Sequence, residues 1–217
     1  MKKSVFLASL VFALLMLLLT GQAVFAQEAS AEVTATASIT ENVEIPYLSD
    51  WQSSAHADFA SEPFRHWDAE DPKEVPVGCA KCHSTPGYQD FLGADGSEAG
   101  VVDKPVPVGS VVSCVACHNE KTQGKDSVVM PSGLELKGLG DESRCIECHQ
   151  GRESMVSVNE AISKTGATDE DAVVADLGFR NIHYYAAAAT KYGTLAKGGY
   201  EYEGQSYDAK FAHVEGY

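Results

Sequence analysis

The sequence has few basic side chains, and it has no cysteine outside three short pairs. Its 217 residues include 16 Lys and Arg against 31 Asp and Glu, which gives a formal net charge of −15 at pH 7. This excess of acidic groups argues against nucleic acid or an anionic lipid surface as a partner. The chain also contains no nucleophile motif and no glycine-rich phosphate loop. These absences leave the cysteine pairs as the main chemical signal.

All six cysteines belong to one pattern, Cys-x-x-Cys-His, which occurs at residues 79–83 (motif 1), 114–118 (motif 2) and 145–149 (motif 3). This pattern is typical of covalent c-type haem attachment: two thiols form thioethers with the vinyl groups, and the histidine is the proximal iron ligand. About one helical turn separates the cysteines, which places both sulfurs along one porphyrin edge. The sequence therefore predicts three covalently bound haem c groups. The expected attachment residues are Cys79, Cys82, Cys114, Cys117, Cys145 and Cys148, and the expected proximal ligands are His83, His118 and His149.

Other uses of paired cysteines are zinc binding, a redox-active dithiol and disulfides. Zinc sites usually combine two half-sites, and three half-sites do not pair off. A zinc site also gives no reason for a histidine directly after each pair. A thioredoxin-like dithiol needs one motif in a strand-to-helix turn, whereas this chain has three. Disulfides between motifs stay open at this stage.

The first 26 residues have the form of a secretory signal peptide. Lys2 and Lys3 precede an apolar run over residues 5–20, and small residues follow up to Ala26. Export to the periplasm or the cell exterior is expected, and the alternative is an uncleaved segment that anchors the chain in a membrane. Residues 27–50, rich in Ala, Ser, Thr and Glu, are predicted to be a flexible linker. Residues 51–217 are then one trihaem domain.

The expected fold class is mostly α with extensive irregular loops, organised around the covalent haems. We expect a short helix at 51–59, and Pro86 with Gly87 should end any helix that begins at Cys79. Residues 106–108 are suited to an edge strand. Helices are predicted over 153–163, over 168–177 after a capping-box pattern, and over 181–189 up to Gly193. A C-terminal hairpin is predicted over 200–211.

A six-coordinate haem needs a second axial ligand, and four histidines lie outside the motifs. These candidate distal ligands are His56, His66, His183 and His213, each beside aromatic residues suited to packing on a porphyrin. Met130 and Met155 are further candidates. Histidine on both faces of the iron favours a low potential and leaves no open position for a substrate. These considerations favour an electron carrier over an enzyme. Candidate partners for haem propionates are Arg65, Arg144, Arg152 and Arg180.

The segment Trp51-Gln52-Ser53-Ser54-Ala55-His56-Ala57, followed by the three motifs, resembles multihaem c-type cytochromes in which W-x-x-S-x-H-A precedes the first motif. That resemblance implies that His56 is a distal haem ligand. The segment Asn181-Ile182-His183-Tyr184 is similar to distal-ligand helices in larger cytochromes of the octahaem reductase type. Similar chains continue into further C-x-x-C-H motifs, so this chain is also expected to be a truncated piece of a longer cytochrome, in which His213 serves a further haem.

The leading functional hypothesis is an exported trihaem cytochrome that carries electrons in anaerobic respiration between redox partner proteins or to an extracellular acceptor. One alternative is a fragment or subunit of a larger multihaem oxidoreductase that reduces a nitrogen or sulfur oxyanion, which requires an open iron. Another is a subunit of an extracellular cytochrome assembly, in which a histidine passes between subunits. The three hypotheses differ in whether every iron is ligated twice by the same chain.

Overall fold

The computed structural model describes residues 44–169 and 171–211, and compact folding begins at Pro46. The expected signal peptide, most of the expected linker and His213 lie outside the described residues. Within the described ranges, no helix has the length and apolar character needed to cross a bilayer.

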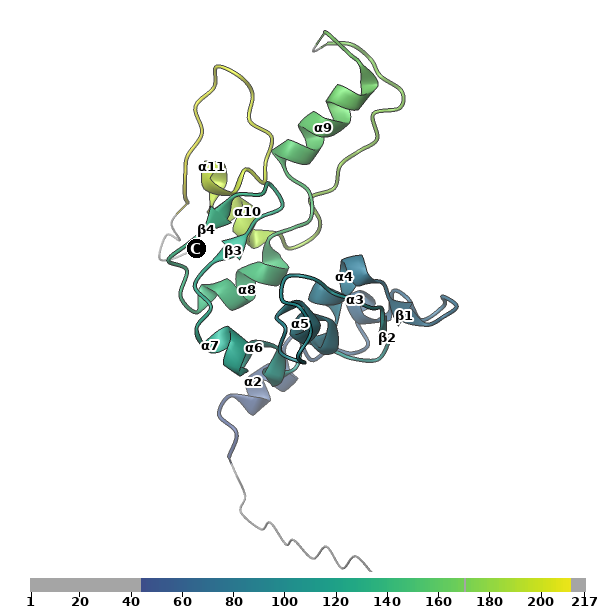
Figure 1. The fold of residues 1–217 in the computed structure, drawn as a ribbon, viewed down its shortest axis with the longest axis vertical. Coiled ribbons are helices and arrows are strands. Elements are labelled where there is room, and N and C mark those ends of the chain that lie inside the picture. Colours follow the sequence, from purple (N-terminus) through teal and green to yellow (C-terminus); the bar gives the residue numbers. More distant parts are fainter. Residues whose placement is uncertain (1–43, 170, 212–217) are drawn as a thin grey trace, which may run out of the picture. The chain divides into compact units, whose positions relative to one another are not determined.

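Short helices joined by long irregular segments make up most of this unit (Figure 1). The helices are α2 (Leu48–Gln52), α3 (Glu62–Arg65), α4 (Val77–His83), α5 (Thr85–Phe91), α6 (Cys114–Cys117), α7 (Glu120–Gln123), α8 (Glu142–His149), α9 (Met155–Thr165), α10 (Ala187–Lys191) and α11 (Gly193–Ala196). The strands form two antiparallel pairs: β1 (Glu74–Val75) with β2 (Val106–Pro107), and β3 (Val128–Val129) with β4 (Glu135–Leu136). The extended segment predicted at 106–108 thus forms as β2.

Three small apolar clusters hold the elements together, and each cysteine motif contributes one residue to a different cluster. Ala80 of motif 1 packs with Val75 and Val106 of the first sheet. Ala116 of motif 2 packs with Tyr88 and Leu92 of α5 and the segment after it. The third cluster brings together Ile146 of motif 3, the β3–β4 pair, α10 and α11. The residues between the paired cysteines therefore dock each motif helix on the protein.

The interior contains few large apolar side chains. The largest side chains that are fully buried are Val128, Thr122, Ser84, Ser143 and Ser154. Several aromatic residues are mostly exposed instead, including Phe179, Tyr184 and Tyr185. Isolated exposed apolar residues are common on protein surfaces. A core divided among small clusters, with polar groups among its most deeply buried side chains, is nonetheless a weak source of stability for a chain of this length.

Pro86 and Gly87 lie in the first turn of α5 and do not merely end α4. Proline fits this position because its missing N–H would have no helical partner there. The hydroxyl of Ser84 caps the helix by accepting a hydrogen bond from the Gly87 N–H at 3.0 Å. A β-carbon on Gly87 would overlap the carbonyl oxygen of Ala80. Glycine thus allows α5 to pack closely on α4.

Three of the predicted helices are wrong or displaced, and one of them, over 181–189, lies at the candidate site. The helix expected at 51–59 is α2, which ends at Gln52, because the hydroxyls of Ser53 and Ser54 donate to the carbonyls of Asp50 and Trp51. The helix expected at 168–177 is absent from the described residues of that segment. There the Asp169 side chain accepts the N–H of Asp171 in a local turn.

The predicted C-terminal hairpin is also wrong, because the described residues after Ala196 contain no strand. The expected turn at Glu203 and Gly204 does form. The flanking backbone groups bond elsewhere: the Asp208 carbonyl accepts the N–H of Thr194, and the N–H of Phe211 donates to the carbonyl of Lys191. Groups that are bonded to α10 and α11 are unavailable for a strand ladder.

The close packing of α5 on α4 can be tested with a pair of glycine substitutions. Gly87→Ala should destabilise the protein by about 1–3 kcal/mol, because the new methyl group overlaps the Ala80 backbone. Gly78→Ala is the matched control, because nothing lies within 4 Å of its β-carbon position in α4. It should be neutral or stabilise the helix by up to about 1 kcal/mol. Urea denaturation of the exported protein, followed by circular dichroism, measures both, and equal effects would contradict this packing.

Candidate functional site

Helix α8, which carries motif 3, is joined to motif 1 by a buried carboxylate. Glu147 of α8 is only 4% exposed at its side chain. Its two carboxylate oxygens contact Lys81 Nζ of motif 1 at 3.1 Å and Lys125 Nζ at 2.9 Å. Gln150 donates a further hydrogen bond to the same carboxylate at 3.1 Å. Both residues between the cysteines of motif 3, Ile146 and Glu147, are buried. Glu147 pairs directly with Lys81, which lies between the cysteines of motif 1.

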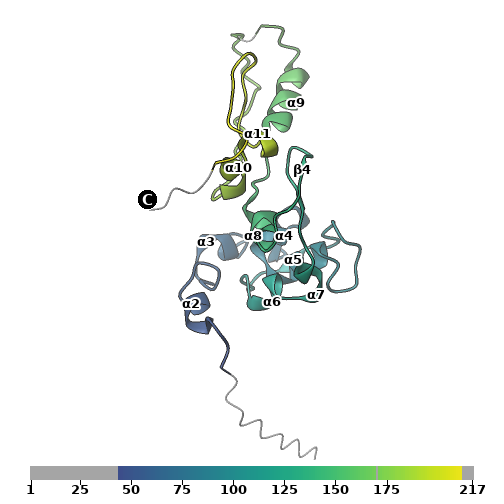
Figure 2. The same ribbon diagram turned by 90° about the vertical axis from the view of Figure 1, so that its left-hand side faces the viewer.

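The second cysteines of motifs 1 and 3 also meet. The Cys148 thiol donates to the Lys81 carbonyl at 3.6 Å, which brings Cys148 next to Cys82 of motif 1. The neighbouring Cys148 side chain is the main cause that lowers the pKa of Cys82, and the neighbouring Cys82 is the main cause that raises the pKa of Cys148. Figure 2 shows α4 and α8 side by side, in agreement with these contacts. The two attachment motifs are thus neighbours in space.

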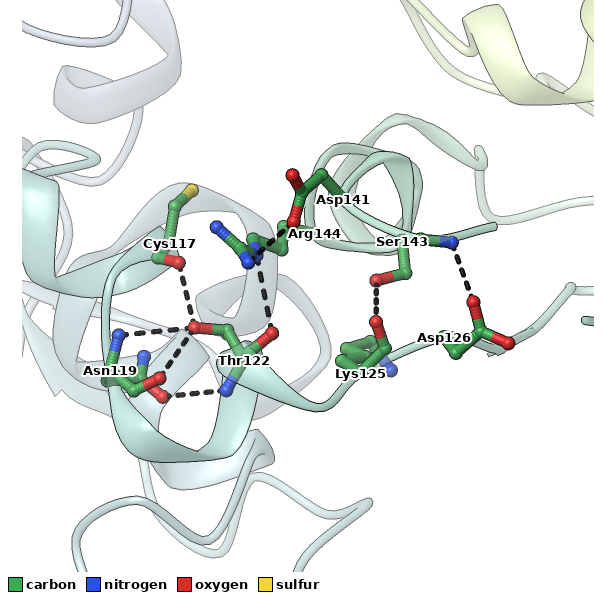
Figure 3. Close-up of polar contacts among 9 residues, drawn as sticks. Cys117, Asn119, Thr122, Lys125, Asp126, Asp141, Ser143 and Arg144 are labelled. Carbon is green, nitrogen blue, oxygen red and sulfur yellow. Dashed lines mark hydrogen bonds and ion pairs between the residues drawn. The ribbon is translucent and has the colours of Figure 1, made fainter. Parts of the chain in front are cut away.

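The segment that follows motif 2 contacts helix α8 (Figure 3). Thr122 is fully buried; its hydroxyl donates to the Cys117 carbonyl at 2.7 Å, and its own carbonyl accepts from Arg144 Nε at 3.3 Å. One step further along, Ser143 Oγ donates to the carbonyl of Lys125 at 2.8 Å. Helix α8 is therefore hydrogen-bonded to the chain on the motif 2 side as well.

The expected proximal histidine of motif 3 faces His56. The ring centroids of His56 and His149 lie 6.1 Å apart. His149 Nδ1 donates to the carbonyl of Tyr185 at 3.0 Å, which leaves Nε2 with a free lone pair. The segment that carries His56 is held in place by Val112, whose N–H donates to the His56 carbonyl and whose carbonyl accepts from Trp51 Nε1.

The expected proximal histidine of motif 1 faces His183 in the same way. The ring centroids of His83 and His183 lie 5.8 Å apart, and His83 Nδ1 donates to the carbonyl of Pro63 at 2.9 Å. His183 has a φ of 95°, in the left-handed region that a residue with a β-carbon seldom occupies. Such strain is usually found where the surroundings fix a functional group.

The segment around His183 is not the predicted helix over 181–189, because other groups take its backbone atoms. The Asn181 side chain accepts the N–H of His183 at 3.0 Å, and the Ile182 carbonyl accepts the N–H of Arg152. The helix begins only at Ala187. Gly151, directly after α8, allows the close approach, because a β-carbon there would lie 2.6 Å from the Ile182 carbonyl oxygen. Gly193, expected to end the helix, instead begins α11.

The pKa is lowered in three of these four imidazoles, which favours the neutral ring. Burial is the main cause that lowers the pKa of His56, His83 and His183 below the usual histidine value. Neighbouring charge adds to it: His149 acts on His56, and Arg152 acts on His183. The neutral ring is the form that ligates a metal.

The remaining candidate ligands are not brought together in this way. His66 is exposed, bonds Glu62 through Nδ1 at 2.8 Å, and stacks on Trp67, which lies between it and His83. Met130 is a buried core residue of the β3–β4 cluster. His118 of motif 2 is exposed, and within the described residues no second ring pairs with it.

Arg152 differs from the other three arginines considered for propionates. Arg65 pairs with Asp68 at 2.7 Å, Arg144 with Asp141 at 2.7 Å, and Arg180 with Glu153 at 3.8 Å. Over residues 44–169 and 171–211, Arg152 has no such ion pair, and its charge acts on Cys79, His83 and His183. Its guanidinium is therefore placed to bind an anion beside motif 1.

The donor set fits an axially ligated haem at two of the three motifs. A bond from a metal to imidazole nitrogen is about 2 Å long, so two rings bound to one ion have centroids about 6 Å apart. The 6.1 Å and 5.8 Å separations match this value. A closed zinc site is less well matched, because no three His, Cys, Asp or Glu side chains converge in the described part of the chain. No disulfide joins any of the six cysteines.

Sequence reasoning missed the roles of Glu147, Lys81 and Lys125. The two residues between paired cysteines were treated as spacers, yet opposite charges at the same position of motifs 1 and 3 were a usable signal. Lys125 had no such signal, because only the folded chain brings it to Glu147.

Comparisons of the chain with protein-family models, with curated proteins and with solved structures find no match.

The buried carboxylate gives a direct test of how motifs 1 and 3 are held. Glu147→Gln should destabilise the protein, because it leaves Lys81 and Lys125 without a counter-charge. The expected loss is near the low end of about 3–5 kcal/mol, since both lysines keep about a fifth of their side-chain surface exposed.

Glu142→Gln on the same helix is the matched control. Glu142 pairs with Lys191 at 2.6 Å, but both side chains are well exposed, so the loss should be at most about 1 kcal/mol. Urea denaturation of both variants gives the comparison. An equal loss in the two would show that the Glu147 contacts do not hold the motifs.

Proposed function

We propose that the protein is an exported trihaem c-type cytochrome that carries electrons between redox partner proteins or to an extracellular acceptor. The observation that carries the proposal is the pairing of His56 with His149 and of His83 with His183. In each pair one ring belongs to a C-x-x-C-H motif and the other comes from a distant part of the chain. Two such pairs, each joining a motif histidine to one from a distant segment at a spacing compatible with axial ligands, support the proposal.

The chain's residues would divide the work in a simple way. Haem c supplies an iron that alternates between the ferrous and ferric states. The cysteine thiols fix the group covalently, and His83 and His149 bind the iron through Nε2 while Nδ1 stays bonded to a carbonyl. That second bond fixes the tautomer and orients the ring. His56 and His183 would supply the second ligand at these two sites, which would leave no open position for a substrate.

The packing of the chain agrees with this assignment. Its own core is small, and the aromatic residues Tyr184 and Tyr185 next to His183 are 76% and 86% exposed. Porphyrins would cover such rings and supply apolar surface that the side chains lack. Arg152, which has no ion pair among the described residues, would bind a propionate beside motif 1, because a guanidinium matches the geometry of a carboxylate.

The two histidine pairs make a prediction that separates the candidate ligands. His56→Ala and His183→Ala should each convert one haem of the oxidised protein to the high-spin form, and that haem should bind carbon monoxide when reduced. His66→Ala is the matched control and should leave the spectra unchanged, because its ring bonds Glu62 and not the motif. Optical and electron paramagnetic resonance (EPR) spectra of the haem-loaded variants provide the measurement. A high-spin haem in His66→Ala, with none in His183→Ala, would refute the pairing.

Motif 2 favours a second candidate function, a subunit of a cytochrome assembly. His118 is exposed, and no ring lies opposite it within the described residues. The second axial ligand of the iron at motif 2 would therefore come from another copy of the chain or from His213. A haem attached at this exposed motif would lie near the surface, which suits electron transfer between subunits.

Dilution distinguishes the two sources of that ligand. If a second copy supplies it, one haem should change from low-spin to high-spin as the protein is diluted to monomer, and the change should reverse on concentration. A spectrum that is independent of concentration but altered by His213→Ala would instead place the ligand within the same chain and argue against the assembly.

A further inference from the structure

We propose that the attachment sites of motifs 1 and 3 form a closely spaced pair and that Glu147 is the positioning residue that holds them in register. This inference rests on the proposed function, because it concerns the order in which electrons pass between the sites. Sequence order alone would make motif 2 the neighbour of both. The contacts between the motifs indicate a different arrangement.

The first line of evidence is that motifs 1 and 3 touch through their own residues. Lys81 and Glu147 lie 66 positions apart in the sequence and pair at 3.1 Å. Cys148 bonds the backbone of motif 1 through the Lys81 carbonyl at 3.6 Å, next to Cys82. Each sulfur stands for a thioether that would join one edge of a porphyrin. Two such edges would therefore be adjacent.

Motif 2 meets motif 1 in a different way. Helix α5 packs against both α4 and α6, and its buried Tyr88 belongs to the cluster that contains Ala116 of motif 2. The polar link between the two regions runs through flanking residues: the Ser113 N–H donates to Thr85 Oγ1 at 2.8 Å. No residue of motif 1 pairs with one of motif 2 among the described contacts. Motif 3 also meets motif 2 through apolar packing, because Cys148 lies against the cluster that contains Ala116. Among the described contacts, the salt bridge between motif residues joins motifs 1 and 3.

Glu147 has the chemistry of a positioning residue, not of a ligand. Its carboxylate binds Lys81 and Lys125 and is almost fully buried, so it contacts neither imidazole pair. It links helix α8 to α4 through one salt bridge and to the chain after motif 2 through the other. Removing its charge should loosen the fit between motifs 1 and 3 while leaving all axial ligands in place.

The pairing is tested by EPR on the haem-loaded protein, with His183→Met as a label. Methionine raises the potential of its haem, so the site of motif 1 is reduced first and loses its paramagnetism. The signal of motif 3 is identified as the one that changes in His56→Met. On selective reduction of the first site, the signal of motif 3 should sharpen and that of motif 2 should not. Sharpening of the motif 2 signal alone, or of neither, would overturn the inference.

The role of Glu147 is tested in the same experiment. Glu147→Gln should reduce the sharpening, whereas the surface variant Glu142→Gln should match the parent protein. If Glu147→Gln does not accumulate, Lys81→Gln tests the same link and leaves Glu147 paired with Lys125. Unchanged coupling in the buried variant would show that Glu147 has no positioning role. Haem content, measured first, separates the two proposals: a chain without haem refutes the proposed function and this inference with it, while three haems without coupling between motifs 1 and 3 refute only this inference.

Discussion

A single buried carboxylate constrains the arrangement of the three cysteine motifs. Glu147 can be buried only if cations reach it, because an isolated charge in a protein interior is expensive. Lys81 and Lys125 meet this need from two different parts of the chain, and each brings one side of the fold against α8. Apolar groups of similar size could stabilise the interface equally well, but they would fix its geometry less strictly. The network therefore matters mainly for where the motifs lie.

The rest of the chain is packed through small apolar clusters. Ala80, Ala116 and Ile146 each dock one motif helix on a separate small cluster. Polar groups such as Thr122 and Ser143 fill space that larger apolar residues would fill in an ordinary domain of this size. Such an interior suits a protein whose apolar volume is completed by large cofactors. It also explains why aromatic rings beside His183 stand exposed in the polypeptide alone.

Features that depend on neighbouring residues could be predicted from the sequence, whereas those that depend on contacts between distant residues could not. The C-x-x-C-H motifs and the helix after residue 153 could be predicted from short patterns. The helix over 181–189 could not, because Arg152 and His149 take the carbonyls of Ile182 and Tyr185 that a helix would use.

Two of the candidate ligands, His56 and His183, have rings beside motif histidines, and their ligand role stays a prediction. His66 has aromatic neighbours in the sequence, as His56 and His183 do. Only the folded chain shows that its ring bonds Glu62 and that Trp67, not His66, packs on His83.

The central proposal is that the six cysteines bind three haems covalently through thioether bonds. The most direct measurement is the intact mass of the exported protein under denaturing conditions, combined with a titration of its reactive thiols. The account predicts a mass that exceeds the polypeptide by three haem groups and no reactive thiol. A polypeptide of unmodified mass with six reactive thiols would contradict it.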